Sequence, residues 1–226
     1  ISTFSTNIMK MNDSGNQYGF NTTTDTHMIK NMEWGAVAYL SHSKYGTCDN
    51  GTCHEIGINN NRNYLTGCGA EAGSSSSSTC NSYNTELGMQ ASTTGNIYGV
   101  YDMSGGAYEY TMGNIVSTDG TTMIAGISGF TTYPESKYYD KYSYGTDNTQ
   151  MIRSKLGDAI KEVYNTEWDG WYGDTSCLVF SVHPWLHRGG NYSEDSGAGL
   201  FYSNTNFGGS FDDYYDYNSS RLIITP

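Results

Sequence analysis

The chain has 226 residues, enough for one substantial hydrophobic core but too few for two ordinary domains, so we expect a single domain over residues 1–226. Its 11 basic and 23 acidic residues give a formal charge of −12, which would repel phosphate backbones and anionic membranes and therefore excludes nucleic acid as an expected partner. Abundant glycine (28) and tyrosine (21) predict a folded chain rich in turns and loops rather than a helical bundle.

The N-terminal residues carry no targeting signal. Ile1 to Phe4 lack the basic and apolar regions of a signal peptide. No apolar run approaches the roughly 20 residues that span a bilayer. We expect either a chain that is soluble as written or one from which a leader or membrane anchor has been removed.

Two segments have the apolar spacing of amphipathic helices. Thr24 or Asp25 can cap a helix over residues 28–42, with an apolar stripe formed by Trp34, Val37, Ala38 and Ser41. A second helix is predicted over residues 149–163, where the following residues share one face: Ile152, Leu156, Ala159, Ile160 and Val163.

Four of the five cysteines follow the first helix in pairs that bracket short polar loops. This spacing predicts an oxidising compartment and two local disulfides, Cys48–Cys53 and Cys68–Cys80. The alternative is a zinc site that includes His54, although zinc sites usually show paired C-x2-4-C motifs and only Cys48-x4-Cys53 comes near. Cys177 lies in an apolar stretch, which is typical of a buried structural thiol.

The last fifty residues favour short strands separated by glycines and polar loops. β-branched and aromatic residues gather in three runs, at residues 177–180, 198–201 and 221–224. Together with the helices they predict an α+β fold with two main helices, short strands and long loops.

Three ordered motifs resemble one known family. Residues 95–110 (GNIYGVYDMSGGAYEY) are similar to the "GN.YG.YDM.GN..EW" signature of the formylglycine-generating-enzyme-like branch of the C-type lectin fold. Residues 187–192 (HRGGNY) resemble its "RGG.W" segment, and residues 219–224 (SSRLII) stand where the family has "GFR.V". With the helical segment EWGAVAYL at residues 33–40, the resemblance covers roughly residues 27–226. It implies a C-type-lectin-like fold.

Within this branch the sequence is similar to pilin-like surface proteins of gut Firmicutes and to variable proteins of diversity-generating retroelements in bacteria or their phages. The first likeness implies an extracellular, cell-surface domain whose N-terminal anchor is absent from this sequence, so no membrane contact is expected of the segment. The second implies a variable, ligand-binding region at residues 191–218.

The codon chemistry of such retroelements can be compared with the sequence directly. Randomising the adenines of AAC or AAT codons never produces Lys, Glu, Gln, Met or Trp, and residues 195–221 contain none of these five types. The alternative is that this segment only reflects a chain rich in Tyr, Asn, Asp and Gly, as loops generally are.

Such a composition is typical of antibody-like binding surfaces, because tyrosine offers contact area at low entropic cost while Ser, Asn and Gly adapt. We therefore expect a surface that binds a protein or glycan on another cell or surface, with the tyrosines at 214, 215 and 217 as anchors. The predicted ligand-binding residues are Asn191, Tyr192, Ser193, Tyr202, Asn204, Asn206, Phe207, Asp212, Asp213, Tyr214, Tyr215, Asp216 and Tyr217.

Catalysis has no visible machinery in the sequence. The family's oxidases use a copper-binding cysteine pair near the C-terminus, and no cysteine follows Cys177. The only histidine pair with metal-like spacing, His183 and His187, is interrupted by Pro184, so we interpret both as structural. We expect a binding protein rather than an enzyme, with a structural pilin-like or surface-layer subunit as the alternative.

Calcium is the one cofactor that the sequence leaves open. Glu194-Asp195 and Asp212-Asp213 supply hard oxygen ligands, but neither pair has an EF-hand-like spacing. We interpret both acidic pairs as parts of solvated loops, and we expect no cofactor.

Overall fold

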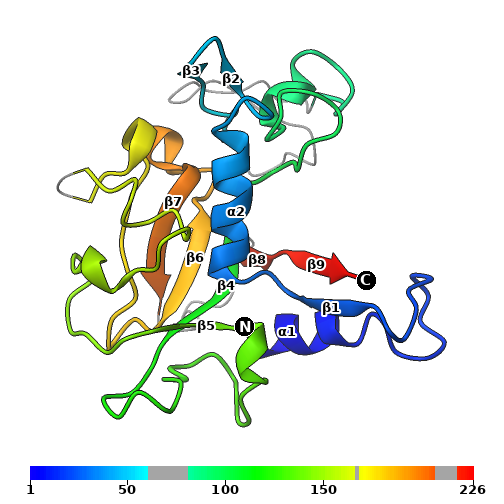
Figure 1. Cartoon of the computed structure of the whole chain (residues 1–226). Coiled ribbons are helices and arrows are strands. Elements are labelled where there is room, and N and C mark those ends of the chain that lie inside the picture. Colours follow the sequence, from blue (N-terminus) through cyan, green and yellow to red (C-terminus); the bar gives the residue numbers. More distant parts are fainter. Residues whose placement is uncertain (61–80, 166–167, 207–217) are drawn as a thin grey trace.

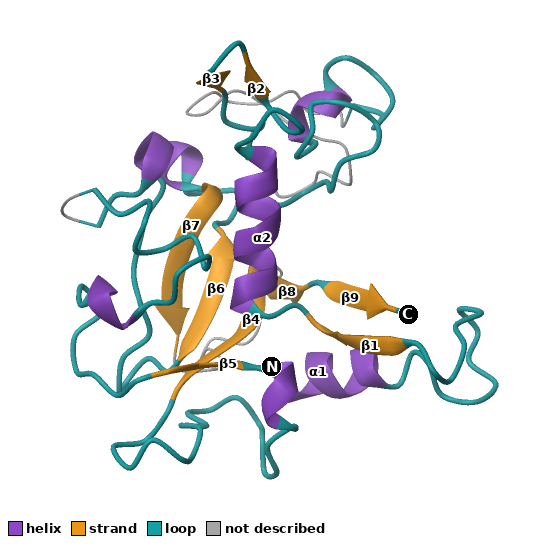
Figure 2. Cartoon of the chain, viewed as in Figure 1, coloured by secondary structure: helices purple, strands orange, loops and turns teal. Residues whose placement is uncertain are grey.

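A computed structural model describes residues 1–60, 81–165, 168–206 and 218–226. The described residues form a mixed α+β structure with two α-helices, short strands and long connections, which confirms the predicted class. Figure 2 shows how much of the chain is loop. Several short 3-10 helices interrupt these loops, at Gly88–Ala91, Ser136–Tyr138, Met151–Arg153, Trp171–Gly173 and Asp195–Gly197.

The largest sheet has the strand order β5 (Asp140–Tyr142), β4 (Tyr108–Ile115), β6 (Trp185–Gly189) and β7 (Gly199–Asn206). Strand β8 (Asn218–Ser220) also pairs with β4. It pairs with the first residues of β4 and β5 pairs with the last, both in parallel, so β8 and β5 lie end to end along one side of β4. Strand β7 is at the opposite edge, antiparallel to β6.

Near the two ends of the described chain, β1 (Asp25–Met28) pairs antiparallel with β9 (Leu222–Thr225). Helix α1 (Ser2–Met9), which the sequence analysis did not predict, packs beside β1 (Figure 1). A third, small sheet is the hairpin of β2 (Cys48–Asp49) and β3 (Thr52–Cys53), which lies beyond the last turn of α2.

Helix α2 (Asn31–Ser41) crosses one face of the large sheet (Figure 1). It begins three residues later than predicted, because the preceding residues are paired with β9. Its first turn is capped by Glu33, whose carboxylate accepts a hydrogen bond from the Lys30 backbone N–H at 2.8 Å. Trp34 and Ala38 of the predicted stripe are fully buried, and the Trp34 indole donates to the Leu200 carbonyl at 2.8 Å.

The second predicted helix, over residues 149–163, is wrong. The Asp158 carboxylate accepts hydrogen bonds from the backbone N–H groups of Lys155 and Ile160, which offers the chain an alternative to helical pairing. Ala159 adopts a left-handed φ of 55°, which a right-handed helix cannot contain. As a result Ile152 and Leu156 are each 79% exposed instead of facing the core.

The predicted strand at residues 177–180 is also wrong, since this run makes no ladder, although Leu178 and Val179 are buried in the core. Its neighbour Ser176 makes one isolated bridge to Ser203. The strands predicted at residues 198–201 and 221–224 are confirmed as β7 and β9, with shifted ends.

The sheet is buried on both faces. Tyr110 and Met112 of β4 and Trp185 of β6 pack in one cluster, which α1 covers. Ile115 of β4 and Leu186 of β6 belong to a second cluster on the other face. Because alternate side chains of a strand point to opposite faces, β4 reads as an almost continuous run of buried residues rather than as an alternating pattern.

Candidate ligand-binding surface

Two glycines that the backbone requires lie where β6 ends and the loop between β6 and β7, residues 190–198, begins. Gly189 and Gly190 have φ values of +81° and +70°, in the left-handed region that other residues rarely adopt. At Gly190 a Cβ atom would also lie 2.6 Å from the Cβ of Ala198. The RGG segment therefore ends the strand and turns the chain sharply into the loop.

Glu194 ties this loop to the sheet. Its Oε1 accepts hydrogen bonds from the phenol of Tyr108 on β4 and from the phenol of Tyr202 on β7, the latter at 3.0 Å. Burial raises the pKa of Glu194, while the two phenol hydrogen bonds act in the opposite direction. One carboxylate thus joins the loop to two strands that are not adjacent in the sheet.

The two phenols belong to an aromatic platform under the loop. The ring of His187 lies 4.3 Å, centroid to centroid, from the Tyr108 ring in an edge-on contact, and Tyr108 stacks with Tyr202 at 6.0 Å. Burial lowers the pKa of His187 to about 4, so this imidazole is neutral at physiological pH. It contributes packing rather than charge.

Two of the predicted ligand-binding side chains do not face solvent. Tyr202 is fully buried, because β7 extends to Asn206 and places this tyrosine within the sheet rather than in a loop. Asn191 is 5% exposed, and its Oδ1 accepts from the Ser193 backbone N–H at 2.8 Å and from the Ser193 hydroxyl at 2.7 Å. Both residues support the surface instead of presenting their side chains on it.

Four other predicted residues belong to the described part of the chain. Tyr192 is half-buried and Ser193 is exposed. Asn204 is half-buried, and its amide donates to the Tyr202 phenol at 3.2 Å. Asn206 is the last residue of β7. The remaining predicted residues lie outside the described part of the chain: Phe207, Asp212, Asp213, Tyr214, Tyr215, Asp216 and Tyr217.

The chain returns to the sheet at β8, where a charge pair holds it. The Arg221 guanidinium donates to both oxygens of Glu109, with Nε at 2.8 Å from Oε2, and its Nη2 donates to the Asp102 carbonyl at 3.1 Å. Burial raises the pKa of Glu109, and the adjacent Arg221 opposes that shift. Tyr108 and Glu109 belong to the longest motif of the sequence, residues 95–110, but neither was predicted to take part in the site; the motif itself was the signal that could have indicated them.

The acidic pairs suggested as calcium ligands have different surroundings. The Glu194 carboxylate is engaged by two phenols, as described, whereas Asp195 is exposed at a left-handed φ of 47°. The second pair, Asp212 and Asp213, lies outside the described residues.

Two carboxyl groups lie near the start of β7. Asp174 is fully buried and accepts a hydrogen bond from the Phe201 backbone N–H at 2.9 Å, and the charge of the half-buried Glu55 acts on it to raise its pKa further. Because two carboxylates can only accept hydrogen bonds, we expect the pair to hold one proton. Burial, the largest cause in each case, raises the pKa of Glu55 to about 7 and raises that of Asp174 well above its usual range.

This pair should make stability fall as the pH rises. The folded protein retains a proton that the unfolded chain releases near pH 4.5. The free energy of unfolding therefore decreases as the pH rises from 4.5 to about 7. We expect Glu55→Gln to reduce this loss by on the order of 2 kcal/mol. Denaturant titrations of both proteins at pH 5 and pH 8 would measure the difference, and equal pH dependence in the two proteins would contradict the shared proton.

The cysteines differ in state. Cys48 and Cys53 form a disulfide, which confirms that prediction, while Cys68 and Cys80 lie outside the described residues. Cys177 is a free, buried thiol, and burial raises its pKa to about 12, so it remains protonated. Among the described residues, a ring nitrogen of His42 lies within 4.8 Å of both sulfur atoms, whereas His54 of the zinc alternative does not belong to this group.

Comparison with known proteins assigns the chain to no family, since no protein-family model and no curated protein matches the sequence. Across the described ranges, none of the helices has the length and apolar character needed to cross a bilayer.

Proposed function

We propose that the chain is a ligand-binding module with a C-type-lectin-like fold, displayed outside the cell, and that residues 191–218 contact a protein or glycan on another cell or surface. One observation carries the proposal: the Glu194 carboxylate binds the phenols of Tyr108 and Tyr202, so the loop with Tyr192 and Ser193 is held against the sheet. A loop that is ordered before binding loses less conformational entropy when a ligand arrives.

The motifs that resemble the family contact one another, which supports the C-type-lectin-like fold as part of the proposal. The Gly105 backbone N–H donates to the Gly189 carbonyl at 2.7 Å, and the Tyr192 N–H donates to the Gly106 carbonyl at 2.9 Å. Arg221 of the third motif binds Glu109 of the first. Segments that are far apart in the sequence thus meet at the proposed surface.

The residue types of the segment favour recognition over chemistry. Residues 195–221 contain none of the five types that adenine randomisation excludes, and they are rich in Tyr, Asn, Asp, Ser and Gly. Tyrosine provides contact area and a hydrogen bond, and the small polar residues adapt to different partners. The Cys48–Cys53 disulfide supports an extracellular location, because such bonds persist in oxidising compartments.

Replacing the tyrosine anchors should abolish binding without unfolding the protein. We expect the triple variant Tyr214→Ala, Tyr215→Ala, Tyr217→Ala to lose binding at least about 100-fold, since aromatic anchors carry most of the energy of such interfaces. The measurement uses the fluorescently labelled chain on fixed bacterial cells and on an array of defined glycans. The melting temperature of the triple variant should differ from that of the natural chain by only a few degrees.

The matched control removes three exposed tyrosines elsewhere, Tyr18, Tyr45 and Tyr98, which are 51%, 71% and 87% exposed. This control should bind as the natural chain does. A large loss of melting temperature in the first variant would place its tyrosines in the core and contradict the proposal. Ordered filaments or lattices by electron microscopy, with no bound cell or glycan, would favour a structural subunit instead.

Sequencing natural copies of the gene tests the variable character of the surface separately. Substitutions confined to template adenines within residues 191–218 would identify a diversified binding surface. An unvarying segment would exclude this mechanism.

A further inference from the structure

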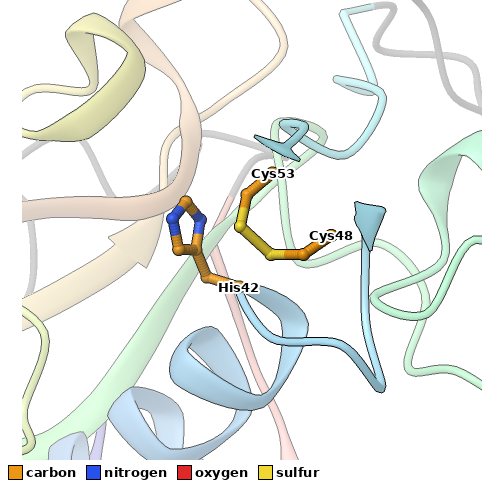
Figure 3. Close-up of side chains that lie close together, drawn as sticks. All are labelled: His42, Cys48 and Cys53. Atoms are coloured by element: carbon orange, nitrogen blue, oxygen red, sulfur yellow. A yellow bond between two sulfur atoms is a disulfide. The ribbon is translucent and has the colours of Figure 1, made fainter. Parts of the chain in front are cut away.

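The disulfide hairpin lies against a histidine from another element. Figure 3 shows the His42 imidazole, at the end of α2, beside the sulfur atoms of Cys48 and Cys53. The two sulfurs and a ring nitrogen all lie within 4.8 Å of one another. A tetrahedral zinc ion, with bonds of about 2.3 Å to sulfur and 2.0–2.1 Å to nitrogen, needs ligand atoms roughly 3.5–3.8 Å apart. Small side-chain rotations therefore suffice to bring these three atoms to such an ion.

We propose that reduction of the Cys48–Cys53 disulfide creates a metal site in which two thiolates and the His42 imidazole bind a soft divalent cation, with Zn²⁺ as the expected ion. A dithiol reductant supplies two electrons and two protons, the S–S bond breaks into two thiols, and the reductant becomes a disulfide. The ion then displaces one proton from each thiol as it binds. Thiolate and imidazole ligands favour this class of metal.

The hairpin keeps the two cysteines opposed without the covalent bond. Cys48 and Cys53 are register partners on β2 and β3, so both side chains project from the same face of the hairpin. The turn between them is Asn50-Gly51, with φ values of 48° and 84°, as a type I′ turn requires. This turn chemistry is local, and it remains when the disulfide is opened.

Backbone and side-chain contacts tie the hairpin to the end of α2. The Thr47 N–H donates to the Ser41 carbonyl at 2.7 Å, and the Thr47 hydroxyl donates to the His54 carbonyl at 2.5 Å. His42, which supplies the third ligand, directly follows Ser41 and is the C-cap of α2. The distance between the imidazole and the thiols is therefore set by ordered backbone.

Neighbouring side chains also contact the imidazole. Its centroid lies 4.5 Å from the Trp171 ring and 5.7 Å from the Phe201 ring, and its Nδ1 is 3.0 Å from the Tyr172 phenol oxygen. Histidines that bind metals are commonly oriented by such neighbouring groups. The three protein ligands leave a fourth position for water, and a cavity of about 540 Å³, lined in part by Cys48, gives access to the hairpin.

The experiment adds Co²⁺, as a visible substitute for Zn²⁺, to the full chain after reduction with a water-soluble phosphine that does not bind the metal. We expect one Co²⁺ per chain, with thiolate-to-cobalt charge-transfer absorption and the visible bands of tetrahedral cobalt, and we expect Zn²⁺ to displace it. The oxidised chain should show neither band. His42→Ala should weaken binding by about tenfold or more, because one of three ligands is lost.

Two controls keep the result specific to these residues. His54→Ala should bind Co²⁺ as the natural chain does, and so should the double variant Cys68→Ser, Cys80→Ser. The proposal is overturned if chains with confirmed free thiols show no cobalt–thiolate absorption. It is equally overturned if binding survives His42→Ala unchanged in a folded variant, or if it disappears in the Cys68–Cys80 double variant.

Discussion

Replacing Arg188 with methionine should lower the free energy of unfolding by about 3–5 kcal/mol, the size of loss found when a buried charge is left without its compensating partner. Arg188 is fully buried on β6, and its guanidinium donates to the Asn31 side chain at 3.3 Å and to the carbonyls of Asp158 and Ala159, each at 3.2 Å. Removing it leaves these acceptors, and the buried Asp158 carboxylate, without the positive charge that balances them.

The pKa directions agree with this interpretation. Burial raises the pKa of Asp158 and lowers that of Arg188 to about 10, while their mutual attraction opposes both shifts. Denaturant unfolding of the two proteins at pH 7 measures the loss. The control Lys44→Met removes an exposed cation and should change stability by less than about 0.5 kcal/mol. An equally small loss for Arg188→Met would show that the buried network contributes little to stability.

Arg221→Met should destabilise the fold by about 3 kcal/mol at pH 7, because it leaves Glu109 buried and charged. The Glu109 side chain is 8% exposed and that of Arg221 is 23% exposed, so the pair is well shielded from water. At lower pH Glu109 can take up a proton in the variant, so the loss should shrink as the pH falls. Since Arg221 follows β8, this variant should also weaken binding at the proposed surface.

A double-mutant cycle with Glu109→Gln isolates the pair. If the ion pair itself causes the loss of stability, the double variant should lose less stability than the two single variants lose together. The difference, the coupling energy, should be about 2 kcal/mol. Losses that simply add would show that the two residues stabilise the fold independently. In that case Arg221 would act mainly through its hydrogen bond to the Asp102 carbonyl.

Local chemistry explains the features that could be predicted from the sequence. The stripe from Trp34 to Ser41 predicted α2, because helical periodicity involves only neighbouring residues. The turn residues between Cys48 and Cys53 predicted their disulfide for the same reason. Residues 187–192 were identified only as part of the family resemblance; the structure adds that Gly189 and Gly190 have a left-handed φ, where glycine fits without strain.

The features that could not be predicted depend on contacts between distant segments. The periodicity of residues 149–163 indicated a helix, but the Asp158 carboxylate accepts a hydrogen bond from the Tyr142 phenol, and the carbonyls of Asp158 and Ala159 accept from Arg188 on β6. Tyr202 was expected on the surface, but it is enclosed by Tyr108, which lies almost a hundred positions earlier. Neither outcome leaves a trace in a short window of sequence, because each depends on a partner that only the folded chain brings near.

The sequence by itself determined the α+β class, helix α2 and the hairpin disulfide, since each depends on interactions within a few residues. Only the tertiary structure decided that Glu194 joins the β6–β7 loop to β4 and β7, that Glu55 acts on the buried Asp174 carboxyl group, and that His42 rather than His54 lies beside the disulfide. The physical reason is the same in each case: burial and charge pairing act across space, between residues whose separation along the chain does not predict their contact.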